Sequence, residues 1–129
     1  MVILKIYIAG KITGLKPTEY RHKFGYIASK LRLEGNRVIN PATMLSELNS
    51  EGFEHSDLMH ICYAAIDVCD AVYMLSNWYE SKGAKMEHQY ALDKGKKVIY
   101  QGVTNENKKI QSYRYSSKSE NGGMGERST

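Results

Sequence analysis

Short apolar runs alternate with apolar stripes at helical spacing along most of the chain. Residues 2–9 form a nearly continuous apolar run that stops at Gly10, a pattern typical of a strand buried on both faces of a parallel sheet. Three further apolar runs, at residues 37–40, 71–75 and 97–100, predict three more strands. The first of these three ends before Pro41, which cannot donate a hydrogen bond to a sheet.

Helices are predicted between these strands. The first begins near Pro17 and carries an apolar face until Gly35 stops it. The residues on that face are Tyr20, Phe24, Ile27, Ala28 and Leu31. Another helix follows a cap at Ser56 or Asp57 and buries a stripe within residues 58–69, and a third runs from about residue 82 to 94. Residues 42–52 are expected to form a loop with a short helical piece.

The regular alternation of strands and helices predicts an α/β fold with a doubly wound parallel sheet of four to five strands. Crossovers in such sheets are right-handed, and ligands bind beyond the carboxyl ends of the strands. The loops after Ala9, Asn40 and Leu75 are therefore expected to build the functional site.

The length of 129 residues fits one domain, expected over residues 1–101. Residues 102–129 are rich in Asn, Ser, Lys and Gly and are expected to form a flexible polar tail. The net charge of +4 is compatible with a small anionic ligand or with simple solubility. A polynucleotide bound through the aromatic and basic tail residues, such as Tyr113 and Arg114, is the less favoured interpretation.

No apolar run is long enough to span a membrane, and the first residues lack the basic leader of a signal peptide, so a cytoplasmic protein is expected. Cys62 and Cys69 would lie about 10 Å apart along a helix, too far for a disulfide, and are expected to be reduced thiols. The histidines show no spacing typical of metal ligands, so no metal site is expected.

The clearest candidate chemistry lies at the start of the third predicted helix. Ser81 is placed to cap this helix, whose first N–H groups attract anions. Gly83 and Glu87 are four residues apart and share one face, so the missing side chain at Gly83 leaves room above the Glu87 carboxylate. Glu87 could attack an electrophilic sugar carbon, or bind sugar hydroxyls, or be an ordinary surface glutamate.

The loop after the first strand is a candidate phosphate-binding turn. Gly10 and Gly14 would allow the backbone to approach a ligand, and Lys11 and Thr13 would supply donors. The loop contains no dinucleotide-binding or Walker motif, and a purely structural turn is an equally good interpretation.

Two further residues have both a functional and a structural interpretation. Trp78 could stack on a base, although a loop anchor packed on the sheet is the commoner fate of such a residue. Asp70 could be a catalytic acid, although a structural acceptor for loop N–H groups is favoured.

Four motifs in this order resemble the nucleoside 2-deoxyribosyltransferase-like superfamily, in particular a branch common in bacteria and their phages that lies near the nucleoside monophosphate N-hydrolases. The motifs are YIAGKITG at 7–14, Asn40 with Pro41, IDVCDAVYML at 66–75, and Trp78 followed by SKGA at 81–84 and Glu87. The resemblance covers roughly residues 2–101.

This resemblance implies a flavodoxin-like or Rossmann-like fold, usually in a dimer or larger homo-oligomer, that acts on nucleosides or nucleoside monophosphates without a metal or organic cofactor. It implies that Glu87 is the nucleophile and that Ser81 helps to hold a phosphate, which favours hydrolysis slightly over transfer. The loop at 10–14 matches the phosphate-facing turn of the hydrolases, and Tyr7 and Trp78 would border the base or sugar.

One position departs from the family pattern. Characterised relatives have an aspartate eight residues before the acid that opens the third strand, where it assists departure of the base, and this chain has Cys62 there. A thiol is a poor substitute for this proton donor. Either Asp67, Asp70 or His60 takes over the role, or the protein is a noncatalytic module that binds or sequesters a nucleotide.

Overall fold

The computed structural model describes residues 3–102, except for the side chain of Asn49. The chain divides into two compact units, Met1–Ile99 and Tyr100–Thr129, and only the first three residues of the second unit are described. The predicted flexible tail thus lies outside the described residues.

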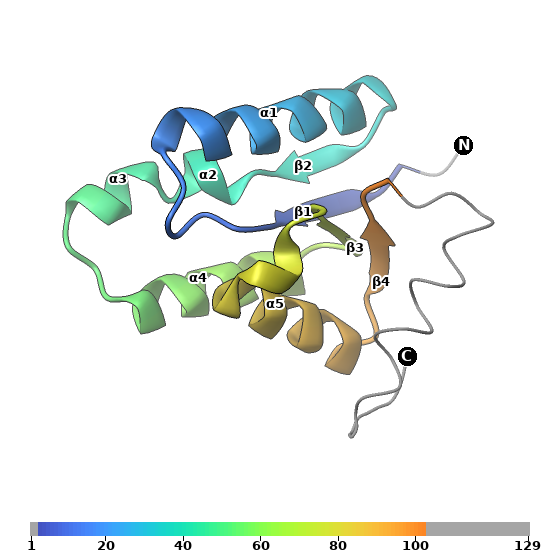
Figure 1. Ribbon diagram of the computed structural model, residues 1–129. Helices are drawn as coiled ribbons and strands as arrows, with labels where there is room; N and C mark the ends of the chain where they lie inside the picture. Colours follow the sequence, from blue (N-terminus) through green and yellow to red (C-terminus); the bar gives the residue numbers. More distant parts are fainter. Residues whose placement is uncertain (1–2, 103–129) are drawn as a thin grey trace. The chain divides into compact units, whose positions relative to one another are not determined.

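The described residues contain a four-stranded parallel sheet, as predicted, and its strand order is β2-β1-β3-β4 (Figure 1). The strands are β1 (Lys5–Ala9), β2 (Arg37–Ile39), β3 (Ala71–Met74) and β4 (Lys97–Tyr100). In register, Ile6 of β1 lies opposite Val38 on one side and Ala71 on the other. β1 starts later than predicted, and the Leu4 N–H instead donates to the Asn36 side chain at 3.0 Å.

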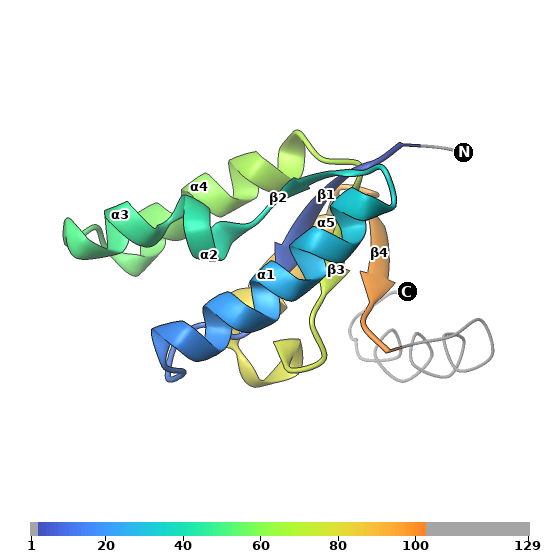
Figure 2. The same ribbon diagram turned by 90° about the horizontal axis from the view of Figure 1, so that it is seen from above.

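Helices cover both faces of the sheet (Figures 1 and 2). α1 (Pro17–Leu33) lies on one face, and α4 (His55–Asp67) and α5 (Lys82–Asp93) lie on the other. This arrangement is the doubly wound architecture of Rossmann-like and flavodoxin-like proteins, in which right-handed crossovers on either side of β1 place helices on opposite faces.

The alternation of side chains along β1 sends consecutive residues to different faces. Ile6 and Ile8 join the core under α1, whereas Tyr7 points to the opposite face, where its hydroxyl reaches α5. All three side chains are at most 1% exposed, which explains why the run looked continuously apolar in the sequence. The α1 side of the core also contains Phe24, Ile27, Ala28, Leu31, Ala42, Ala71, Tyr73 and Leu75.

The segment predicted as a loop with a helical piece contains two short helices, α2 (Pro41–Met44) and α3 (Ser46–Ser50). Asn40 starts α2 by accepting a hydrogen bond from the Ala42 N–H at 3.0 Å, and Pro41 occupies the first helical position, where no N–H is needed. The polar loop after β3 likewise contains one short 3₁₀ helix, η1 (Trp78–Glu80).

The helix starts agree only in part with the prediction. Ser81 caps α5, because its Oγ accepts a hydrogen bond from the Ala84 N–H at 3.1 Å. The prediction for α4 was wrong: its cap is Glu54, and Asp57 sits in the first turn, where it accepts the Glu54 N–H at 3.2 Å. Cys69 lies just beyond the end of α4, and both cysteines are free, as predicted.

None of the helices within residues 3–102 combines the length and the apolar composition needed to cross a lipid bilayer. Over the same residues, no three His, Cys, Asp or Glu side chains gather in a group able to hold a metal ion.

Candidate functional site

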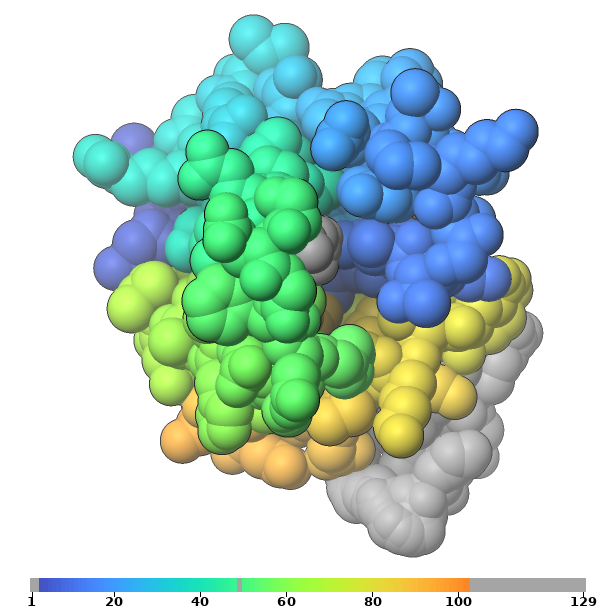
Figure 3. All heavy atoms as spheres, turned by 90° about the vertical axis from the view of Figure 1, so that its left-hand side faces the viewer, coloured from blue at the N-terminus to red at the C-terminus, as the bar shows by residue number. Residues whose placement is uncertain are grey.

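A cavity of about 480 Å³ lies at the carboxyl ends of β1 and β3, where the chain leaves the sheet toward opposite faces. This volume is within the range of roughly 300–1,000 Å³ that is typical of small-molecule sites. All three predicted loops contribute to it: Thr13 follows β1, Pro41 follows β2 and Ser81 follows β3. In Figure 3 the surface is hollowed where the green, blue and yellow segments meet. The position is thus the one expected for a ligand site in a doubly wound sheet.

The floor of the cavity carries one buried carboxyl group, that of Glu87. Glu87 is only 7% exposed although it lies in the middle of α5. The Tyr7 hydroxyl, which β1 directs toward α5, donates a hydrogen bond to Glu87 Oε2 at 2.8 Å. Burial of a carboxyl group is costly without such partners, so this arrangement is unlike that of a surface glutamate.

Cys62 of α4 is the second hydrogen-bond partner of Glu87. Burial, and then the nearby Glu87 charge, raise the pKa of the Cys62 thiol to about 12, so the sulfur keeps its proton at neutral pH. Burial also raises the pKa of Tyr7 well above its usual value. Both neighbours of the carboxyl group therefore remain protonated donors.

The protonation of Glu87 is balanced near neutrality. Burial raises its pKa to about 7, and the hydrogen bonds from Tyr7 and Cys62 oppose this shift because they stabilise the ionised form. Near pH 7 the group is thus present in both forms. The ionised form is a nucleophile or base, and both forms accept hydrogen bonds at the floor of the cavity.

Gly83, in the first turn of α5, lines the cavity one helical turn before Glu87. A Cβ atom at this position would lie 3.5 Å from Met59 Sδ, 3.6 Å from His55 Nε2 and 3.9 Å from Ser81 Oγ. These are ordinary contact distances, so Gly83 is not required for packing. Its missing side chain instead enlarges the cavity.

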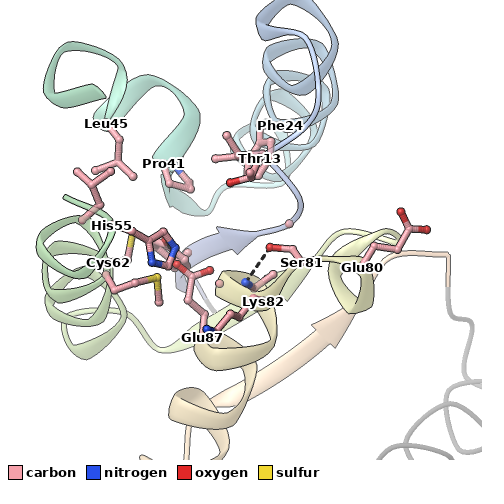
Figure 4. Close-up of a pocket in the computed structure, with 17 residues that line it drawn as sticks. Thr13, Phe24, Pro41, Leu45, His55, Cys62, Glu80, Ser81, Lys82 and Glu87 are labelled. Atoms are coloured by element: carbon pink, nitrogen blue, oxygen red, sulfur yellow. Dashed lines mark hydrogen bonds between the residues drawn. The ribbon is translucent and has the colours of Figure 1, made fainter. Parts of the chain in front are cut away.

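Gly10 combines a packing role with a place in the cavity wall. A Cβ atom there would lie only 2.6 Å from Leu75 Cδ1 and 3.0 Å from Leu75 Cβ. Gly10 therefore lets the turn after β1 pass close to the end of β3. Thr13, further along the same loop, also lines the cavity (Figure 4).

Two predicted residues of this loop do not line the cavity. Lys11 joins the loops after β1 and β3: its N–H donates to Asn77 Oδ1 at 3.2 Å, and its Nζ pairs with Glu80 Oε1 at 3.4 Å. Gly14 adopts a φ of +89°, so it serves the turn that leads to α1. The two residues shape the loop that presents Thr13.

Trp78 and Asp70 also lie outside the cavity wall. Trp78 is 6% exposed and its ring packs on His88 with centroids 4.3 Å apart, which favours its interpretation as a loop anchor. Asp70 precedes the amino end of β3, at the edge of the sheet opposite the cavity, and accepts the Lys5 N–H at 2.9 Å. This placement favours the structural interpretation of Asp70.

The sequence interpretation singled out Cys62 of α4 but missed the other contributions of this helix to the cavity. His55, Leu58, Met59 and Cys62 line the cavity. Their spacing of three, four and seven residues places them on one helical face. The sequence interpretation assigned Leu58 and Cys62 to an apolar core stripe and gave no role to His55 or Met59. The usable signal was the histidine at the polar end of this stripe. The remaining wall is largely apolar. It includes Phe24 of α1, together with Pro41 and Leu45 at the two ends of α2.

Fold and cavity together define a Rossmann-like α/β protein with a ligand-sized site built around one buried carboxyl group. The model of the DUF4406 family, described as a domain of unknown function, matches residues 4–100, and the chain belongs to this family. Neither the curated proteins nor the solved structures contain a match to the chain.

Proposed function

We propose that the protein cleaves the N-glycosidic bond of a (deoxy)nucleoside or a nucleoside 5′-monophosphate, with Glu87 as the nucleophile. The enzyme would be an N-glycosidase or a 2-deoxyribosyltransferase, and Ser81 favours hydrolysis. The observation that carries the proposal is the Glu87 carboxyl group, which is buried at the floor of a ligand-sized cavity that Gly83 also lines. The resemblance to the nucleoside 2-deoxyribosyltransferase-like superfamily supplies the substrate class.

In the proposed reaction, an ionised Glu87 oxygen attacks C1′ of the sugar. The C1′–N bond breaks, its electron pair stays on the base nitrogen, and the base leaves with a proton. Water, or a second base in a transfer reaction, then attacks C1′ and releases the Glu87 carboxylate. The Tyr7 hydroxyl holds the carboxylate in place through both steps.

The cavity offers a distinct surface to each part of such a substrate. The pentose would lie beside Gly83, which lines the cavity and shares one face of α5 with Glu87. A 5′-phosphate would lie near Ser81 and Thr13, at the amino end of α5. The base would pack on the apolar wall formed by Phe24 and Met59.

Two further features belong to the same proposal. The resemblance implies a homo-oligomer, a dimer or larger, and a reaction without a metal or organic cofactor. Light scattering on the purified full-length chain measures the first feature. Base release in the presence of a chelator, from protein with no bound chromophore, measures the second.

The alternative is a noncatalytic nucleotide-binding module. It is favoured by the thiol at Cys62, which stands where the related enzymes carry a proton-donating carboxyl group and which keeps its own proton firmly at neutral pH. Such a protein would bind or sequester a nucleotide in the same cavity without breaking it.

Chromatography separates the two candidates. The full-length protein is incubated with a panel of deoxynucleosides and their 5′-monophosphates, and the free base is quantified. We expect release by the wild type and by Asp93→Asn, a matched carboxyl-to-amide change on the exposed part of the same helix, but not by Glu87→Gln or Glu87→Ala. Unchanged nucleotide together with measurable binding would establish the module instead.

A further inference from the structure

One imidazole group lies at the rim of the cavity, that of His55. It is the first residue of α4, and Met59 and Cys62 continue the same helical face toward the floor, where the Cys62 thiol meets Glu87. His55 itself is exposed. The face thus runs from a solvent-exposed imidazole ring to the buried carboxyl group.

The ring points toward the start of α5 rather than away from the cavity (Figure 4). His55 Nε2 lies 3.6 Å from the point that a Gly83 Cβ would occupy, and Ser81 Oγ lies 3.9 Å from the same point. Gly83 precedes Glu87 by four residues, which is about 6 Å of helix rise. His55 at the rim and Glu87 at the floor thus line the same cavity, so a nucleoside held between them would meet Glu87 with its sugar and His55 with its base.

The other candidates for a proton donor lie elsewhere or are engaged. Asp67 accepts the Tyr90 hydroxyl at 2.8 Å, and Asp70 accepts a backbone N–H at the opposite edge of the sheet. His60 is exposed and does not line the cavity. Glu80 lines the rim but pairs with Lys11.

We propose that His55 is the group that protonates the departing base, and this inference rests on the proposed glycosidase function. The imidazolium Nε2–H transfers its proton to a ring nitrogen or carbonyl oxygen of the base as the C1′–N bond breaks and Glu87 bonds to C1′. The neutral imidazole then accepts a proton from the water that attacks C1′, so the cycle ends with His55 protonated and one water molecule added across the glycosidic bond.

A comparison of two leaving groups tests this role. A purine nucleoside needs protonation of its base, whereas its N7-methylated form already carries the positive charge and leaves without it. We expect His55→Asn to lower kcat/KM for the unmodified nucleoside by about 10²- to 10⁴-fold, the usual contribution of a general acid, and to leave kcat/KM for the methylated substrate, which reports the steps up to departure of the base, largely unchanged. His55→Gln should give the same pattern.

His60→Asn is the matched control, because it removes an exposed histidine from the same helix outside the cavity, and both rates should stay at the wild-type level. An equal loss with both substrates, or no loss with either, would overturn the role of His55. Failure of the proposed function looks different: the wild type would release no base from either nucleoside, or Glu87→Gln would release as much as the wild type.

Discussion

The two ends of the sheet use polar side chains in opposite ways. At the amino end, Asp70 and Asn36 complete the hydrogen bonds of strand termini: Asp70 accepts the Lys5 N–H and Asn36 accepts the Leu4 N–H. At the carboxyl end, Glu87 is buried, is bonded by the Tyr7 side chain rather than by any strand terminus, and faces a cavity.

This difference separates a structural acid from a candidate catalytic one. A carboxylate that satisfies backbone N–H groups at an exposed edge stabilises the fold, and its interactions account for its presence. A carboxyl group that is buried beside empty space raises the free energy of the folded state when ionised, so its presence is better explained by function. Each prediction below tests whether the two ends differ in this way.

The largest expected effect is a loss of activity without a loss of stability at Glu87, and the reverse at Asp70. Glu87→Gln should lower base release by at least about 10³-fold, because the nucleophile is gone, while the amide keeps the hydrogen bond to Tyr7 and the fold. Asp70→Ala should leave kcat unchanged but lower the free energy of unfolding by about 1 kcal/mol through the lost bond to Lys5. Activity assays and urea unfolding measure both, and Asp70→Asn, which keeps an acceptor, restores the stability. Loss of activity in Asp70→Asn would contradict the purely structural role of the acid at the amino end of the sheet.

The next effect is a pH dependence of stability that belongs to Glu87. Its pKa is about 7 in the folded state against an ordinary value of 4.5 for a glutamate, so the proton binds more tightly to the folded chain. The resulting stability is complete below pH 4.5 and is lost as the pH rises through 7, by about 3 kcal/mol.

His88 has the opposite slope, because burial lowers its pKa to about 4 and stability is lost as the pH falls from 6.5. Unfolding curves of wild type and Glu87→Gln, which share His88, isolate the contribution of Glu87. A stability difference that stays constant between pH 4.5 and 7 would contradict the buried, shifted carboxyl group.

Two glycines at the carboxyl end should respond differently to a single methyl group. Gly10→Ala places Cβ against Leu75 and should lower the free energy of unfolding by about 1–3 kcal/mol. Gly83→Ala meets only ordinary contacts and should raise it by about 0.5–1 kcal/mol through helix propensity, while KM increases because the space above Glu87 is filled. Thermal unfolding and steady-state kinetics measure the two effects. An unchanged KM in Gly83→Ala would place the substrate elsewhere.

The smallest effect concerns phosphate recognition at Ser81. Ser81→Asp keeps an acceptor for the Ala84 N–H and so preserves the cap of α5, but it adds a negative charge beside the proposed phosphate position. We expect kcat/KM for 5′-monophosphates to fall about tenfold relative to that for nucleosides, with little change in stability. Ser81→Asn is the neutral control and should keep the wild-type ratio. If the ratio of kcat/KM for 5′-monophosphates to kcat/KM for nucleosides were the same in both variants, Ser81 would not contact the phosphate.

Much of the fold was predictable because local pattern and tertiary structure agree. The helical stripe of α1, the buried run of β1 and the cap at Ser81 each carry a strong periodic or capping signal, and all three are present. The cap of α4 was not predictable, because Glu54 is a weak cap by residue type and acts together with Asp57.

The candidate site was predictable where it depends on topology and not where it depends on side-chain direction. The doubly wound order places the loops after β1 and β3 together, and helical spacing places Glu87 beneath Gly83. The inward turn of His55 and the packing of Trp78 on His88 depend on tertiary contacts that no local pattern encodes.

The central claim is that Glu87 bonds covalently to C1′, and the stereochemistry of the reaction tests it most directly. With methanol as acceptor and a β-deoxynucleoside as substrate, the product is a methyl 2-deoxyriboside, which does not mutarotate, so proton NMR identifies the anomer that the enzyme forms. Two displacements at C1′, the first by Glu87, predict net retention and the β-anomer. The α-anomer would show direct attack by the acceptor and would contradict a nucleophilic Glu87.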